Sequence, residues 1–85
     1  MAKPSPQHNQ HPLLVSIGAA IKRSRKVQGI SQEDLALRAG LDRSYMGGVE
    51  RGEHNLTVIS LARVAQALGV ALQVLVCEAE ANDLN

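Results

Sequence analysis

The stretch that most constrains the fold begins at Ser31 and reads SQEDLALRAGLDRSYMGGVE. Ser31 is a residue type that caps helix N-termini, and apolar residues follow it at helical spacing. Gly40 stands where this helix must end, because glycine adopts the left-handed conformation of a helix C-cap without steric cost. Asp42 can cap a second helix. The stretch therefore predicts two short helices joined by a tight glycine turn, over residues 32–39 and 43–51.

This layout is the helix-turn-helix, in which the second helix enters the major groove of DNA. The distribution of charge agrees, although the net charge is only +1. Residues 22–51 hold seven basic and four acidic side chains, whereas residues 78–83 hold three acidic and no basic ones. Tyr45 is the single aromatic residue of types Phe, Trp and Tyr, which argues against a stacking platform for single strands. We therefore expect double-stranded DNA as the partner.

Composition bounds the rest. A chain of 85 residues forms one small domain, and domains of this size often gain stability from a partner subunit. A single cysteine fits a reducing cytosol. The first twelve residues, MAKPSPQHNQHP, lack the apolar core of a signal peptide, and no apolar run approaches the ~20 residues of a membrane span. We expect a cytoplasmic protein with no membrane partner.

The chain divides into a tail, a domain and a second tail. Prolines and polar residues predict a disordered segment over residues 1–12, and acidic residues predict a tail over 78–85. Within the domain, 13–77, a first helix ends at Gly29. A later helix is capped by Thr57 and stops at Gly69, with apolar residues at helical spacing between them.

Residues 70–77, VALQVLVC, admit two interpretations. Alternating β-branched residues favour a strand, whereas Leu72, Leu75 and Val76 would equally mark a short fifth helix. A lone strand has nothing to pair with in a helical monomer, so it would pair with its own copy in a second subunit. Either structure leaves an apolar surface, so we expect a homodimer with these three residues at the interface.

The segment RKVQGISQEDLALRAGLDRSYMGGVERG, with Asn-Leu-Thr at 55–57 and ALGV at 67–70, resembles the Cro/phage-repressor (XRE-type) helix-turn-helix family. The resemblance covers residues 13–77. It implies an all-α, compact five-helix λ-repressor-like domain. It also implies a bacterial or phage-type transcriptional regulator that binds a palindromic operator as a homodimer, regulates its own gene and acts in the cytoplasm at the nucleoid.

Two subgroups of this family are similar to different parts of the chain. LDRSYMGGVERGEHNLT resembles restriction–modification controller proteins. LGVALQVLVCEAEAN resembles HipB-type antitoxins, in which the corresponding segment is a strand paired across the dimer. The alternative function is therefore that of an antitoxin, which neutralises a toxin protein and represses its own operon. The operator sequence and the sign of regulation stay open.

The resemblance also implies roles for individual residues. Arg43 and Ser44 match the first turn of the recognition helix, which faces base edges, and an arginine there can bind guanine N7 and O6. Arg43 has two alternatives, a phosphate clamp and an intrahelical ion pair. The positions that match contacts with the phosphate backbone, which set register, are Gln32, Asp42, Tyr45, Asn55 and Thr57.

Two of these assignments have structural alternatives. Tyr45 could instead cover a small core, and Gln32 could be a solvated residue of a first helical turn. Arg25 and Glu50 match a charged pair that joins the first helix to the recognition helix in phage-repressor relatives. We interpret that pair as structural, with Arg25 as a free phosphate contact the alternative.

Gly47 and Gly48 are unusual inside a helix, because each costs about 0.8–1 kcal/mol relative to alanine. Close approach of the DNA backbone or of a neighbouring helix would compensate. In much of the family, the second of these positions carries a side chain that reads bases. Its absence at Gly48 predicts fewer direct base contacts and more dependence on DNA shape. The alternative is that the two glycines are merely tolerated in a weak helix.

No arrangement of residues indicates an enzyme, a cofactor or a metal site. His8 and His11 form an H-x-x-H in the predicted tail, and neither Cys77 nor His54 lies near them in sequence. His54 could make a pH-sensitive contact with phosphate, although a simple loop residue is the more common interpretation.

Overall fold

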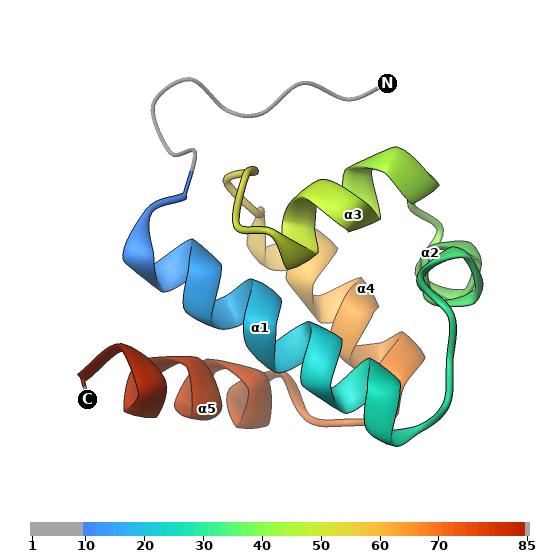
Figure 1. Cartoon of the computed structure of the whole chain (residues 1–85). Coiled ribbons are helices and arrows are strands. Elements are labelled where there is room, and N and C mark those ends of the chain that lie inside the picture. The colour runs from blue at the N-terminus through green and yellow to red at the C-terminus, as the bar shows by residue number, and fades with distance from the viewer. Residues whose placement is uncertain (1–9, 85) are drawn as a thin grey trace.

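Five helices joined by short turns make up the computed structural model, which describes residues 10–84 and the side chains of residues 10–81. They are α1 (Pro12–Val27), α2 (Gln32–Ala39), α3 (Arg43–Glu50), α4 (Val58–Leu68) and α5 (Leu72–Leu84), shown in Figure 1. The described segment contains no strand, and the all-α, five-helix prediction is confirmed. Most of the expected N-terminal tail, residues 1–9, lies outside the described residues.

The helix ends are set by the residues that the sequence singled out. The hydroxyl of Ser31 accepts a hydrogen bond from the Asp34 N–H at 3.0 Å, and the Thr57 hydroxyl caps α4 in the same way. At the C-terminal ends, Gly40 and Gly69 have φ angles of 69° and 72°, which glycine adopts without a Cβ penalty. The predicted caps are thus confirmed, and both motif helices lie within one residue of their predicted ends.

The C-terminal segment is a helix, so the strand interpretation of residues 70–77 was wrong. Leu75 and Ala79, one turn apart, are both fully buried, and α5 lies alongside α1 (Figure 1). Packing of this helical stripe on α1 outweighs the strand preference of the β-branched residues, which is a weak, context-dependent term. The helix continues through Glu78 and Glu80, which the sequence had assigned to the acidic tail.

The burial of Leu75 also corrects its assigned role at a dimer interface. Its side chain is 1% exposed and belongs to the core of a single chain, so it is not accessible to a second subunit while α5 is packed on α1. Leu72 and Val76 are half-buried at the edge of that core and keep accessible surface.

A close contact between α1 and α3 holds α3 in place. A Cβ atom at Gly18 would lie 2.6 Å from the carbonyl oxygen of Glu50, and closer still to that of Val49. Glycine at this position therefore lets α1 touch the backbone at the C-terminal end of α3. A glycine inside a periodic helix was the sequence signal for this contact, and the sequence analysis missed it.

No helix among residues 10–84 is by itself long and apolar enough to span a membrane; α4 and α5 meet that criterion only as a pair, across a bend of 104°.

Candidate DNA-binding interface

The first turn of α3 begins at the surface of the domain. Arg43 is exposed and Ser44 is half-buried. The Arg43 guanidinium lies 3.7 Å from the Glu33 carboxylate, and both side chains are more than 70% exposed. Glu33 belongs to α2, so this is an ion pair between helices rather than the intrahelical pair considered from the sequence. An exposed pair at this distance is weak, which leaves the guanidinium free to take another partner.

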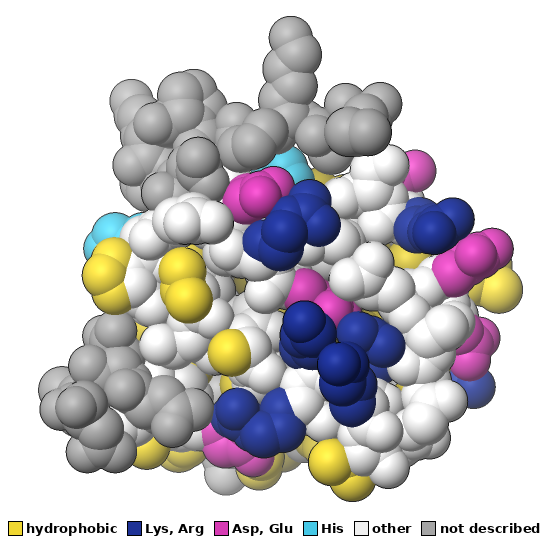
Figure 2. Space-filling view, viewed as in Figure 1, with side chains coloured by type: hydrophobic (Ala, Val, Ile, Leu, Met, Phe, Trp, Pro, Cys, Tyr) yellow, Lys and Arg dark blue, Asp and Glu magenta, His cyan; other side chains and the backbone are white. Residues whose placement is uncertain are grey.

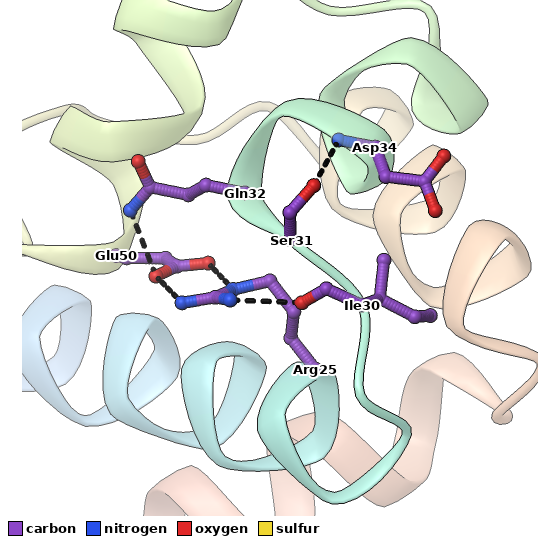
Figure 3. Close-up of polar contacts among 6 residues, drawn as sticks. All are labelled: Arg25, Ile30, Ser31, Gln32, Asp34 and Glu50. Atoms are coloured by element: carbon purple, nitrogen blue, oxygen red, sulfur yellow. Dashed lines mark hydrogen bonds and ion pairs between the residues drawn. The ribbon is translucent and has the colours of Figure 1, made fainter.

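The opposite end of α3 is held by a bidentate ion pair with α1 (Figure 3). Arg25 Nε donates to Glu50 Oε2 at 2.7 Å, and Nη2 donates to Oε1 at 3.1 Å. Arg25 Nη1 also donates to the Ile30 carbonyl at 2.9 Å, and this bond links the turn before α2 to the ion pair. The side chains of Arg25 and Glu50 are 11% and 2% exposed. The pair expected from the sequence is therefore present, and it joins α1, the turn and α3.

Gln32 completes this network from α2. Its Nε2 donates to Glu50 Oε1 at 3.0 Å, so Glu50 accepts from both Arg25 and Gln32 (Figure 3). The side-chain amide nitrogen is thus used within the protein, and Gln32 is not the solvated residue that was considered. Its backbone N–H, at the first position of α2, has no acceptor within the helix and suits an anion.

Asp42 and Thr57 use their side chains as helix caps. The Asp42 carboxylate accepts from the backbone N–H groups of Ser44 and Tyr45, at 3.0 and 3.3 Å. Any contact of these two residues with phosphate would therefore come from backbone N–H groups. Asn55, in the loop between α3 and α4, has an exposed side chain.

Tyr45 and His54 stack on each other over the middle of α3. Their ring centroids are 4.7 Å apart, with 29° between the planes, and His54 is 8% exposed. A Cβ atom at Gly48 would lie 2.5 Å from the His54 ring. Within the described residues, the close approach at Gly48 is therefore made by the loop after α3 rather than by a neighbouring helix. Little of the His54 ring is left for contact with a phosphate.

At Gly47, the missing Cβ atom leaves space for two flexible side chains. A Cβ atom there would lie 3.1 Å from Arg51 Nη1 and 3.4 Å from Gln32 Oε1. The Arg51 guanidinium in turn donates two hydrogen bonds to the Glu53 carboxylate, from Nε to Oε2 at 2.9 Å and from Nη2 to Oε1 at 3.2 Å. This hydrogen-bonded pair holds the pKa of the Glu53 carboxyl below its usual range and raises the pKa of Arg51.

We expect the Glu53 carboxyl to titrate at lower pH in the wild-type protein than in an Arg51→Gln variant. Because the folded-state pKa is lowered, the stabilisation is present above the ordinary glutamate pKa and is lost as pH falls through the folded value. The carboxyl carbon shift of Glu53, followed by NMR against pH, measures both midpoints. Equal midpoints in the two proteins would show that Arg51 does not hold Glu53 in solution.

Comparison with known proteins gives three concordant similarities. A family model described as helix-turn-helix matches residues 21–75. An uncharacterised HTH-type transcriptional regulator, y4dJ of Sinorhizobium fredii, is 42% identical over 65% of this chain and 71% of its own length. Control protein C.MunI of a Mycoplasma species is 31% identical over 78% of this chain and 90% of its own.

The fold is also similar to that of solved structures. The restriction–modification controller protein C.AhdI from Aeromonas hydrophila superposes with a TM-score of 0.75 and 42% identity. The superposition covers 76% of this chain and 98% of that one.

Proposed function

Because this chain belongs to the helix-turn-helix family of DNA-binding transcription regulators, we propose that it acts as a homodimer on a palindromic operator. The family is one of DNA-binding regulators rather than of enzymes. The operator lies near the promoter of the protein's own gene, and the protein acts on it in the cytoplasm at the nucleoid. Its similarity to restriction–modification controllers supports this function.

The observation that carries the proposal is that α3 is fixed to the domain at one end and accessible at the other. Its C-terminal end is held by the Arg25–Glu50–Gln32 hydrogen bonds and by the contact at Gly18, whereas at its first turn Arg43 is exposed and Ser44 is half-buried. A helix held in this way can carry Arg43 and Ser44 into the major groove without moving against the domain. Rigid support of a binding residue is what sequence discrimination requires.

Contacts with the phosphate backbone flank this reading turn in the proposal. The N–H groups offered to phosphate are those of Gln32 on α2 and of Arg43 on α3, because the Asp42 carboxylate already accepts from the N–H groups of Ser44 and Tyr45. Tyr45, Asn55 and Thr57 lie on α3 and on the loop that follows it. These contacts set the register of the protein on DNA and leave sequence discrimination to the base-facing residues and to DNA shape.

Replacing Arg43 with alanine is expected to lower the affinity for the selected duplex by about 1–3 kcal/mol, while binding to scrambled DNA weakens much less. The fold is retained, because the side chain is exposed and its ion pair is weak. Fluorescence anisotropy with both duplexes, at one salt concentration, gives the ratio of affinities.

Arg38→Ala is the matched control, because it removes an exposed arginine that pairs with Asp34 on α2. The control is expected to leave the ratio of affinities unchanged. An Arg43→Ala protein with the wild-type ratio would exclude Arg43 as a base contact.

The dimer is proposed to form through the flank of α5 that carries Leu72 and Val76. Both side chains are half-buried and apolar, and they lie one turn apart on the same side of the helix. A second copy that packed on this flank would complete their burial. Leu75 has no part in this interface, because it is already enclosed in the core.

A Val76→Arg variant is expected to weaken the dimer, because two-fold symmetry would bring like charges together at the interface. Val74→Arg is the control on the other flank of α5, where the valine is 42% exposed. Sedimentation velocity at several protein concentrations gives the association constants, and thermal unfolding checks each fold. If Val74→Arg weakens association and Val76→Arg does not, the interface lies on the opposite flank.

No observation favours the antitoxin alternative. The similarities reported above are to regulators and controller proteins, and they give a toxin partner no support.

A further inference from the structure

The basic residues of the described segment fall into two groups. Ion pairs within 4.0 Å engage Arg23, Arg25, Arg38, Arg43 and Arg51. Lys22 and Lys26 have no acidic side chain within that distance among residues 10–81, and neither does Arg63. The uncompensated positive charge is therefore concentrated on one helix, α1.

Lys22 and Lys26 lie beside the contact between α1 and α3. Both side chains are exposed and stand one helical turn apart. Gly18, one turn before Lys22, touches the end of α3, and Arg25, next to Lys26, bonds with Glu50. Figure 2 shows Lys and Arg side chains gathered in the centre of the face on which α1 lies in front and α3 above it. The two lysines thus extend the candidate interface beyond α3.

We propose that Lys22 and Lys26 form a second contact with DNA, on phosphates outside the base pairs that α3 reads. This inference rests on the proposed function and adds α1 to its interface. Lysine ammonium groups bind phosphates as point charges, without reading sequence. Two like charges one turn apart repel each other in the free protein, and a bound polyanion relieves that repulsion.

The alternative is that the lysines only keep this face of α1 solvated. The two explanations differ in the salt dependence of DNA binding. Each lysine that neutralises a phosphate releases counterions, so log K falls more steeply with log salt concentration. A solvated lysine that touches no phosphate contributes little to this slope.

The experiment compares a Lys22→Gln/Lys26→Gln variant with an Arg38→Gln/Arg63→Gln control. Both variants lose two positive charges. The control residues line a groove at the C-terminal ends of α2 and α4, away from the Gln32–Glu50 contact at the N-terminal end of α2. Binding is measured at several salt concentrations with a duplex selected from a randomised library and with its scrambled version. Thermal unfolding verifies that both variants fold.

We expect the slope of the lysine variant to be shallower by about two per protomer, on both duplexes, while the ratio of affinities for the two stays at the wild-type value. The control keeps the wild-type slope. A lysine variant with the wild-type slope would overturn the inference. A control variant whose slope becomes as shallow as that of the lysine variant would overturn it as well. If the wild-type protein prefers no duplex, the proposed function fails, and the slope on scrambled DNA still tests the two lysines.

Discussion

Replacing Glu50 with alanine is expected to lower the free energy of unfolding by about 3 kcal/mol. The substitution removes the acceptor of two Arg25 N–H groups and of Gln32 Nε2. Arg25 is 11% exposed, so water reaches its guanidinium poorly, and only the hydrogen bond to the Ile30 carbonyl is left. An uncompensated charge in such a site costs more than the ion pair contributes in net stability. Urea denaturation at fixed protein concentration measures the loss.

Two further variants show whether the loss of stability comes from the unpaired buried charge of Arg25. Glu33→Ala removes a carboxylate from the exposed pair with Arg43 and is expected to change stability by less than about 0.5 kcal/mol. An Arg25→Met/Glu50→Leu double variant removes both charges and is expected to recover much of the loss, because apolar side chains can fill the site. A Glu50→Ala protein as stable as wild type would show that this pair does not hold α3 to α1.

Gly18→Ala is expected to destabilise the fold by about 2 kcal/mol. The new methyl group would meet the backbone carbonyls of Val49 and Glu50, which cannot turn aside as a side chain can. Overpacking of this severity costs about 3 kcal/mol, against about 1 kcal/mol gained in helix propensity. Because α1 and α3 must separate, affinity for the selected duplex is expected to fall as well.

The same substitution at Gly47 is expected to change the free energy of unfolding in the opposite direction. Its added methyl would meet the flexible ends of Arg51 and Gln32, at 3.1 and 3.4 Å, and these side chains can shift by a few tenths of an ångström. The gain in helix propensity then prevails, and Gly47→Ala is expected to stabilise by about 0.5–1 kcal/mol. A Gly18→Ala protein whose urea midpoint rises, as that of Gly47→Ala is expected to, would show that the contact at Gly18 is looser than the structure has it. A lowered midpoint for Gly47→Ala would contradict the prediction for Gly47.

The boundaries of α2, α3 and α4 could be predicted because each depends on residues close in sequence. Ser31, Asp42 and Thr57 accept hydrogen bonds from N–H groups two or three positions later, and Gly40 and Gly69 adopt positive φ angles in place. These interactions need no partner from elsewhere in the chain. The pattern of residue types is therefore enough to find them.

The state of α5 depended on a distant partner and could not be read from its own residues. β-Branched alternation and a helical stripe coexist in residues 72–76, and the choice between them comes from packing on α1. The same contact decides that Leu75 is core rather than interface. Local preference was ambiguous here because the decisive energy comes from residues about fifty positions away.

The site was predicted best where the resemblance supplied a matched pair, as for Arg25 and Glu50. It was predicted less well where a contact depends on residues that only the fold brings together. The stack of His54 on Tyr45 above Gly48 joins three residues by shape, and a glycine shows only that something must approach. The bond from Gln32 to Glu50 likewise depends on the distance between α2 and α3.

The measurement that tests the central claim most directly is selection of DNA by the purified protein from a library of randomised duplexes, at fixed salt concentration. The account predicts enrichment of an inverted repeat whose half-sites are separated by about one helical turn, 10–10.5 base pairs from centre to centre. It also predicts that Arg43→Ala protein enriches the same repeat weakly, with relaxed preference at the base pair that Arg43 reads. Recovery of random sequence by the wild-type protein would contradict sequence-specific binding through α3. Enrichment of a single, non-repeated half-site would contradict the dimer.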